Sequence, residues 1–150
     1  ELISLLCEYE NLVIHVINGV VSIDQLQKLY GKGLKLLILG YKNFRKGIDF
    51  YELGLNNIEN KKLDLSINLM KVLLGFDVVS FDNLAINQLN VKDYMPSEKW
   101  NEFYMGDDGQ FTMYMDLVEH KFARCSISDK RHELLNNLDD MFKVVKNEPY

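Results

Sequence analysis

Residues 11–40 decide the fold, and they read NLVIHVINGVVSIDQLQKLYGKGLKLLILG. The first part, Leu12 to Ile17, is short, rich in β-branched residues and almost wholly apolar. This pattern is typical of a strand that is buried on both faces. The run from Leu34 to Leu39 has the same character and ends at Gly40, so we expect a second buried strand there.

The segment between these two strands predicts a helix. Ser22 and Gln25 have the spacing of a capping box, in which the hydroxyl accepts from the Gln25 amide while the Gln25 side chain reaches back. The helix is expected over 23–30, before the glycines at 31 and 33. Strand, helix and strand within about 30 residues form a βαβ unit, whose crossover makes the two strands parallel.

The rest of the chain extends this unit. Helical spacing of apolar residues continues after the second strand, a third parallel strand follows, and then the pattern changes to an alternating strand with an antiparallel partner and a last amphipathic helix. These expected elements are helices over 48–58 and 63–74, a strand over 76–81, a short helix beginning at Pro96, strands over 110–118 and 121–127, and a helix over 134–146. The predicted fold is α/β, a partial barrel or open sheet of three parallel βα units followed by an antiparallel hairpin and a C-terminal helix, in one domain of residues 1–150.

Composition places the chain among globular proteins. Of the 150 residues, 47% are hydrophobic and 26% are charged, far from the composition of a disordered chain. No apolar run reaches the length of a membrane span, and Cys7 and Cys125 are expected to be reduced, buried thiols, so we expect a cytoplasmic protein. Glu1 opens inside an apolar helical pattern, and we therefore expect the chain to be a piece of something longer.

Polar residues follow the three parallel strands. Ligands of open α/β sheets and βα barrels bind outside the carboxyl ends of the strands, so residues at these ends would share one rim. The alternative for each of them is a turn or a helix cap. The rim candidates for a ligand or substrate are Asn18, Lys42, Arg45, Asp82 and Asn83.

Charge is distributed unevenly along the chain. Residues 25–48 contain six bases and no acid, whereas residues 102–119 contain five acids and no lysine or arginine. The acidic stretch also holds aromatic side chains of the kind that dominate the energy of interfaces. The interface candidates are Trp100, Phe103, Tyr104, Asp107, Asp108 and Asp116. Direct binding of nucleic acid by residues 25–48 is the least favoured alternative, because the pI is about 5.2.

Motifs for metal or nucleophilic chemistry are weak. Gly106-Asp107-Asp108 has the sequence of the metal-binding hairpin of RNA-dependent polymerases, but a plain Asp-Gly hairpin turn explains it better. The histidines His15, His120 and His132 lack metal-site spacing, and His15 is expected to be a hydrogen-bonded core residue. Methionines such as Met105 are expected to fill the core. We therefore predict no metal site and no catalytic residue in this chain.

Four segments, in order along the chain, resemble the C-terminal half of phage-encoded radical SAM-like proteins. They are 11–19 (NLVIHVING), 34–42 (LKLLILGYK), 79–86 (VSFDNLAI) and 105–116 (MGDDGQFTMYMD). The resemblance implies a partial barrel of βα units. In that family a Cys-x-x-x-Cys-x-x-Cys loop near the amino end holds a 4Fe-4S cluster, and no such loop is present here.

The resemblance leaves two functions open. The first is a non-catalytic interaction protein with a degenerate radical SAM-like fold, of which an anti-CRISPR inhibitor of an RNA-guided nuclease would be one example. Its acidic segment would bind a basic channel of that partner. The second is the substrate-side half of a radical SAM enzyme, with S-adenosylmethionine and the cluster bound in a longer protein. This chain itself is expected to hold no cofactor.

Overall fold

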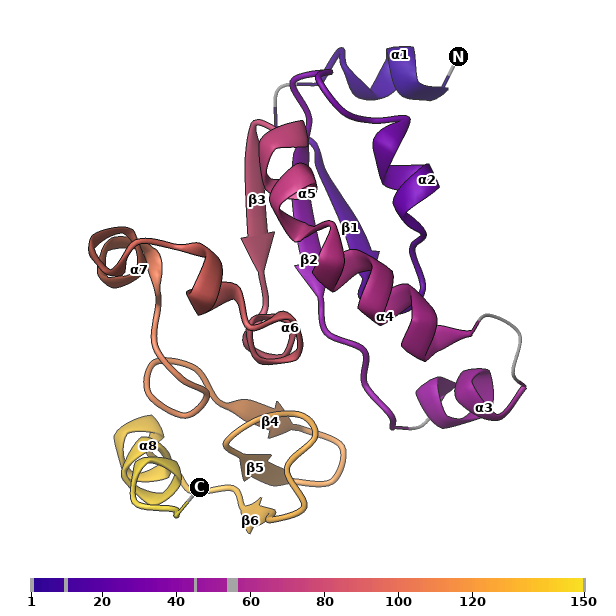
Figure 1. Ribbon diagram of the computed structural model, residues 1–150. Helices are drawn as coiled ribbons and strands as arrows, with labels where there is room; N and C mark the ends of the chain where they lie inside the picture. The colour runs from indigo at the N-terminus through magenta and orange to yellow at the C-terminus, as the bar shows by residue number, and fades with distance from the viewer. Residues whose placement is uncertain (1, 10, 45, 54–56, 150) are drawn as a thin grey trace. The chain divides into compact units, whose positions relative to one another are not determined.

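The computed structural model describes residues 2–9, 11–44, 46–53 and 57–149. Contacts within the chain gather into two compact units, residues 1–98 and residues 99–150. Figure 1 shows the elements of both.

A three-stranded parallel sheet organises the first unit. Its strands are β1 (Val13–Ile17), β2 (Lys35–Leu39) and β3 (Val78–Phe81), in the spatial order β1-β2-β3. Both neighbouring pairs are parallel, with Ile14 opposite Leu36 and Leu36 opposite Val79. The predicted α/β class and the βαβ unit are therefore confirmed.

Short helices precede, connect and follow the strands. They are α1 (Leu2–Leu6), α2 (Ile23–Gln27), α3 (Lys46–Glu52), α4 (Ile58–Ile67), α5 (Leu69–Gly75), α6 (Asn83–Leu89) and the 3-10 turn η1 (Val91–Tyr94). The next helix, α7 (Ser97–Phe103), begins in this unit and ends in the second. The capping box of Ser22 and Gln25 is confirmed, although α2 is shorter than expected. The helix predicted over 63–74 is present as α4 and α5, which meet at Asn68.

The core of this unit lies on one face of the sheet. Leu36 and Ile38 on β2 are fully buried, and they belong to one apolar cluster with Leu65, Leu69 and Val72 of α4 and α5. Figure 1 shows these two helices crossing the three strands. The alternate residues of the central strand thus hold the helices to the sheet.

The opposite face of the sheet is open, which corrects the prediction that the first strand is buried on both faces. Val13, Ile17 and Val78 are 43%, 41% and 47% exposed. His15 is also exposed on this face, so it is not a core histidine. The cause is the strand order: right-handed crossovers between successive neighbouring strands put α2, α4 and α5 on the same side, where they pack on Leu36 and Ile38.

The second unit is built on a small antiparallel sheet. It contains β4 (Tyr114–Asp116), β5 (Lys121–Ala123), β6 (His132–Glu133) and α8 (Leu138–Lys146), with a core of Phe122, Met141 and Val145. The predicted hairpin and C-terminal helix are confirmed, whereas β6 was not predicted. The side chain of Glu148 is buried beside His132, Arg124 and Lys130, and these contacts hold the residues after α8 against the sheet.

Two smaller expectations are corrected by exposure. Met105 is 81% exposed and does not fill the core, although Met141 does. Cys7 and Cys125 are free thiols as expected, but Cys7 lies at the surface. Among the helices that the structure describes, none combines the length and apolarity needed to cross a membrane.

Candidate functional site

Asp82 joins two strands at the predicted rim. It follows β3 and caps α6, because its Oδ1 accepts from the Ala85 amide at 2.7 Å. The same oxygen accepts from the Gly40 amide, just beyond β2, at 2.9 Å. A capping residue therefore also fixes the spacing between neighbouring strand ends.

Gln88 holds the next residue of the rim. Its Oε1 accepts from the Tyr41 amide at 2.9 Å, and its Nε2 donates to the Tyr41 carbonyl at 2.8 Å. Since the Tyr41 backbone sets the orientation of this amide, Asn18 must donate from Nδ2 to Gln88 Oε1, at 3.1 Å. Asn18 is fully buried, and its Oδ1 accepts no hydrogen bond within the described ranges.

The loop after β2 is folded tightly against itself. Tyr41 is buried, and its hydroxyl donates to the Gly47 carbonyl at 2.6 Å. A Cβ at Gly47 would lie 1.9 Å from the Lys42 carbonyl oxygen, so only glycine fits there. Burial raises the pKa of the Tyr41 hydroxyl above its ordinary value, and the charge of Tyr51 raises it further.

The five rim candidates differ in position and in the hydrogen bonds that they make. Asn18 and Asp82 lie at one end of the sheet as predicted, and both act in hydrogen bonds that hold the scaffold. Lys42 is exposed in the loop, and Asn83 is the first residue of α6. Arg45 lies outside the described residues. The role of Gln88 was not predicted, because nothing in the sequence around a glutamine inside a helix indicates that its side chain bonds to the end of a strand.

In the second unit, the interface candidates near α7 form a chain of contacts. The ring of Trp100 stacks on that of Tyr104, with centroids 4.4 Å apart and planes 21° apart. The Tyr104 hydroxyl donates to Asp107 Oδ1. Trp100 and Tyr104 are only partly exposed, whereas Phe103 is 60% exposed. Of these aromatics, Phe103 is therefore the one that presents its ring to solvent.

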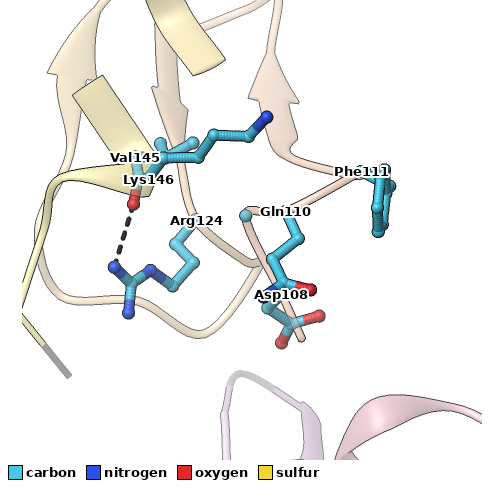
Figure 2. A pocket seen from close by; sticks show the side chains of 7 residues that line it. Asp108, Gln110, Phe111, Arg124, Val145 and Lys146 are labelled. Atoms are coloured by element: carbon cyan, nitrogen blue, oxygen red, sulfur yellow. Dashed lines mark hydrogen bonds between the residues drawn. The ribbon is translucent and has the colours of Figure 1, made fainter. Parts of the chain in front are cut away.

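Residues 106–109 lie between α7 and β4, where the turn covers 108–110 and the Gln110 amide donates to the Asp107 carbonyl at 3.1 Å, so this is not the hairpin turn that the sequence suggested. The Gly109 amide donates to the Thr112 carbonyl at 3.0 Å. Asp108 lines a cavity of about 440 Å³ with Gln110, Phe111, Arg124, Val145 and Lys146, shown in Figure 2. The Arg124 guanidinium there donates to the Val145 carbonyl at 2.9 Å, so it ties β5 to α8.

Two apolar side chains at the tip of the β4–β5 hairpin are largely exposed to solvent. Leu117 and Val118 are 72% and 85% exposed. Asp116 Oδ1 accepts from the Val118 and Glu119 amides, each at 3.0 Å, and its Oδ2 accepts from the Tyr114 hydroxyl at 3.1 Å. Asp116 is thus a turn-forming residue that holds two apolar side chains outward.

Other apolar side chains of the same segment are also exposed. Phe103, Met105, Phe111 and Met115 all have 43% or more of their surface in solvent. They share the segment with the five acids between residues 102 and 119. We refer to residues 100–119 as the acidic segment.

Neither potential metal ligands nor comparisons with known proteins assign a function to these sites. Within the part of the chain that the structure describes, no three His, Cys, Asp or Glu residues lie close enough together to hold a metal ion. Comparisons with protein-family models, curated proteins and solved structures give no significant match.

Proposed function

We propose that this chain is a protein-binding domain of the cytoplasm that acts without catalysis, and that its acidic segment binds a basic surface of a partner protein. The observation that carries the proposal is the hairpin tip, where Leu117 and Val118 are exposed between Asp116 and Glu119. Apolar anchors supply affinity, and surrounding acids select a basic partner and speed its association.

The geometry of the tip supports binding rather than random exposure. Asp116 accepts two amides of the turn, and its second oxygen accepts from Tyr114. A turn that is already ordered loses little conformational freedom when it docks, which favours affinity. The partner that fits this chemistry has a basic surface with an apolar recess. The channel of an RNA-guided nuclease, as implied by the resemblance, is one such surface.

The alternative from the resemblance is the substrate-side half of a radical SAM enzyme. That function would need the predicted rim residue Asp82 to meet a ligand. Asp82 Oδ1 instead accepts two backbone amides, and Gln88 uses both ends of its amide on Tyr41. The hairpin tip therefore supports the binding function better.

The test compares three immobilised forms of the chain as baits for a bacterial extract. They are the wild type, the variant Leu117→Ser/Val118→Ser, and the control Ile67→Ser/Leu74→Ser, whose two positions are 70% and 82% exposed in the first unit. We expect the same basic protein on the wild type and on the control, and its loss from the tip variant.

Charge is tested with a second variant, Asp108→Asn/Glu119→Gln. If acids attract the partner, this variant should release it at a lower salt concentration than the wild type does, because salt screens exposed charges. Equal retention by the tip variant and the wild type, with melting temperatures unchanged, would contradict the proposal.

A further inference from the structure

A second candidate site lies in the first unit and does not depend on the proposed function. A cavity of about 490 Å³ opens at the carboxyl ends of the parallel strands. Its size falls within the range of small-molecule sites. Its lining comes from three strand ends and from the loop and helix that follow β2, and it includes Ile17, Leu39, Lys42, Phe44, Lys46 and Asp82.

The walls of this cavity are mainly apolar. Ile17 and Leu39 are paired across β1 and β2, and they lie on the face of the sheet opposite the buried residues Leu36 and Ile38. Phe44, which is 44% exposed, and Phe50 come from the loop and from α3. The open face of the sheet thus forms one wall, and two aromatic rings contribute the other side.

Positive charge predominates around the opening. Lys42 and Lys46 line the cavity, and Lys61 donates from Nζ to the carbonyl of Val20, another lining residue, at 2.8 Å. Lys62, whose ammonium lies 5.1 Å from the centre of the Tyr41 ring, is paired with Glu59 at 2.9 Å and adds no net charge. Among the described residues that line the cavity, Asp82 is the one acid, and its Oδ1 already accepts two backbone amides. A ligand with negative charge is therefore favoured.

The cavity is held open by short contacts of the chain with itself. The Tyr41 hydroxyl fixes the Gly47 carbonyl at 2.6 Å, and the Gly47 amide donates to the Phe44 carbonyl at 3.0 Å. Gln88 holds the peptide groups on either side of Tyr41. These bonds fix the backbone of the loop that carries Lys42 and Phe44 before any ligand binds. Binding therefore costs little conformational entropy in this loop.

We propose that this cavity binds a small organic anion with an aromatic or branched apolar body. The body lies against Ile17, Leu39 and Phe44, and the anionic group lies at the opening near Lys42 and Lys46. A neutral molecule of the same shape would keep the apolar contacts and lose the attraction to the lysines.

The experiment uses naphthylacetate as the anion and naphthylethanol as its neutral counterpart, with the full chain. Titration followed by amide proton–nitrogen correlation spectra should show saturable shifts at Gly40, Tyr41 and Gly47 with the anion. We expect Lys46→Gln to weaken binding of the anion about two- to fivefold, the effect of an exposed ion pair, and to leave binding of the alcohol unchanged.

Two further variants separate the apolar contacts from charge and from folding. Phe44→Ala should weaken both probes by at least about fivefold through lost apolar contact. The control Lys32→Gln changes an exposed lysine outside the cavity and should leave both affinities unchanged. Melting curves confirm that each variant is folded.

Three results would overturn the proposal: no saturable shift at Gly40, Tyr41 and Gly47, equal affinities of the anion and the alcohol, or an unchanged affinity of the anion in folded Lys46→Gln and Phe44→Ala. Loss of protein binding by the hairpin-tip variant, with naphthylacetate binding intact, would show that the two sites are independent.

Discussion

Gln88 and Tyr41, 47 positions apart in the sequence, hold each other through a pair of opposed hydrogen bonds. The side-chain amide of Gln88 accepts from the amide of Tyr41 and donates to its carbonyl, as the backbone of a neighbouring strand would. The same glutamine oxygen accepts from the buried amide of Asn18. One side chain on α6 therefore organises the ends of β1 and β2.

Replacement of this glutamine tests its role. We expect Gln88→Leu to lower the free energy of unfolding by about 2–4 kcal/mol, because three hydrogen bonds are lost and buried partners are left unsatisfied. Urea unfolding measures the change. The control Gln27→Leu alters an exposed glutamine of α2 and should change stability by less than about 0.5 kcal/mol. Equal effects of the two substitutions would contradict this role.

The hydroxyl of Tyr41 predicts a pH dependence. Its pKa in the folded chain is raised by burial, so the folded chain holds this proton more tightly than the unfolded chain does. The resulting stability is fully present below the ordinary tyrosine pKa of about 10 and is lost as the pH rises toward the folded value.

The variant Tyr41→Phe isolates this effect. At neutral pH it should be less stable than the wild type by about 1 kcal/mol, since the hydrogen bond to Gly47 is missing. Above the ordinary pKa the difference should shrink, because the variant lacks this ionisation. Urea unfolding curves at neutral pH and at a pH above the ordinary tyrosine pKa measure the difference in free energy of unfolding between the two proteins. A difference that does not change with pH would contradict the account. Tyr30, whose pKa is also raised by burial, titrates in both proteins and cancels.

Trp100 is expected to contribute to stability as well as to any interface. Its ring stacks on Tyr104, and such pairs contribute about 0.5–1.5 kcal/mol beyond the buried area. Trp100→Ala should therefore lower the free energy of unfolding by about 1–3 kcal/mol. Tyr104→Phe keeps the stacked ring and should cost no more than about 1 kcal/mol, mainly through the bond to Asp107. If Trp100→Ala leaves thermal unfolding unchanged, the stack does not stabilise this unit.

Local sequence signals were sufficient for much of the fold. The apolar runs at β1 and β2 and the capping box of Ser22 predicted the parallel βαβ unit correctly, because strand burial and helix capping depend on residues close together in the chain. The exposure of His15 was not predicted. A continuous apolar run looks the same whether one or both faces are covered, and only the strand order shows that the helices lie on one side.

The candidate sites were less predictable for a related reason. Asp82 could be recognised as a cap from its position before α6, but its bond to Gly40 joins residues 42 positions apart. The cavity beside Lys46 depends on how the loop after β2 folds back, with Tyr41 bonded to Gly47. Spacing along the sequence does not encode these long-range contacts. The outward direction of Leu117 and Val118 likewise depends on the turn that Asp116 forms.

The hairpin tip is tested as a binding surface by the dissociation constant of the captured partner. This constant is measured for the wild type and for Leu117→Ser/Val118→Ser, together with the melting temperature of each protein. The account predicts that the constant rises by more than about tenfold, the loss expected when central apolar anchors are removed, and that the melting temperature stays the same, because both side chains are exposed. An unchanged dissociation constant in a folded variant would show that the hairpin tip is not a binding surface.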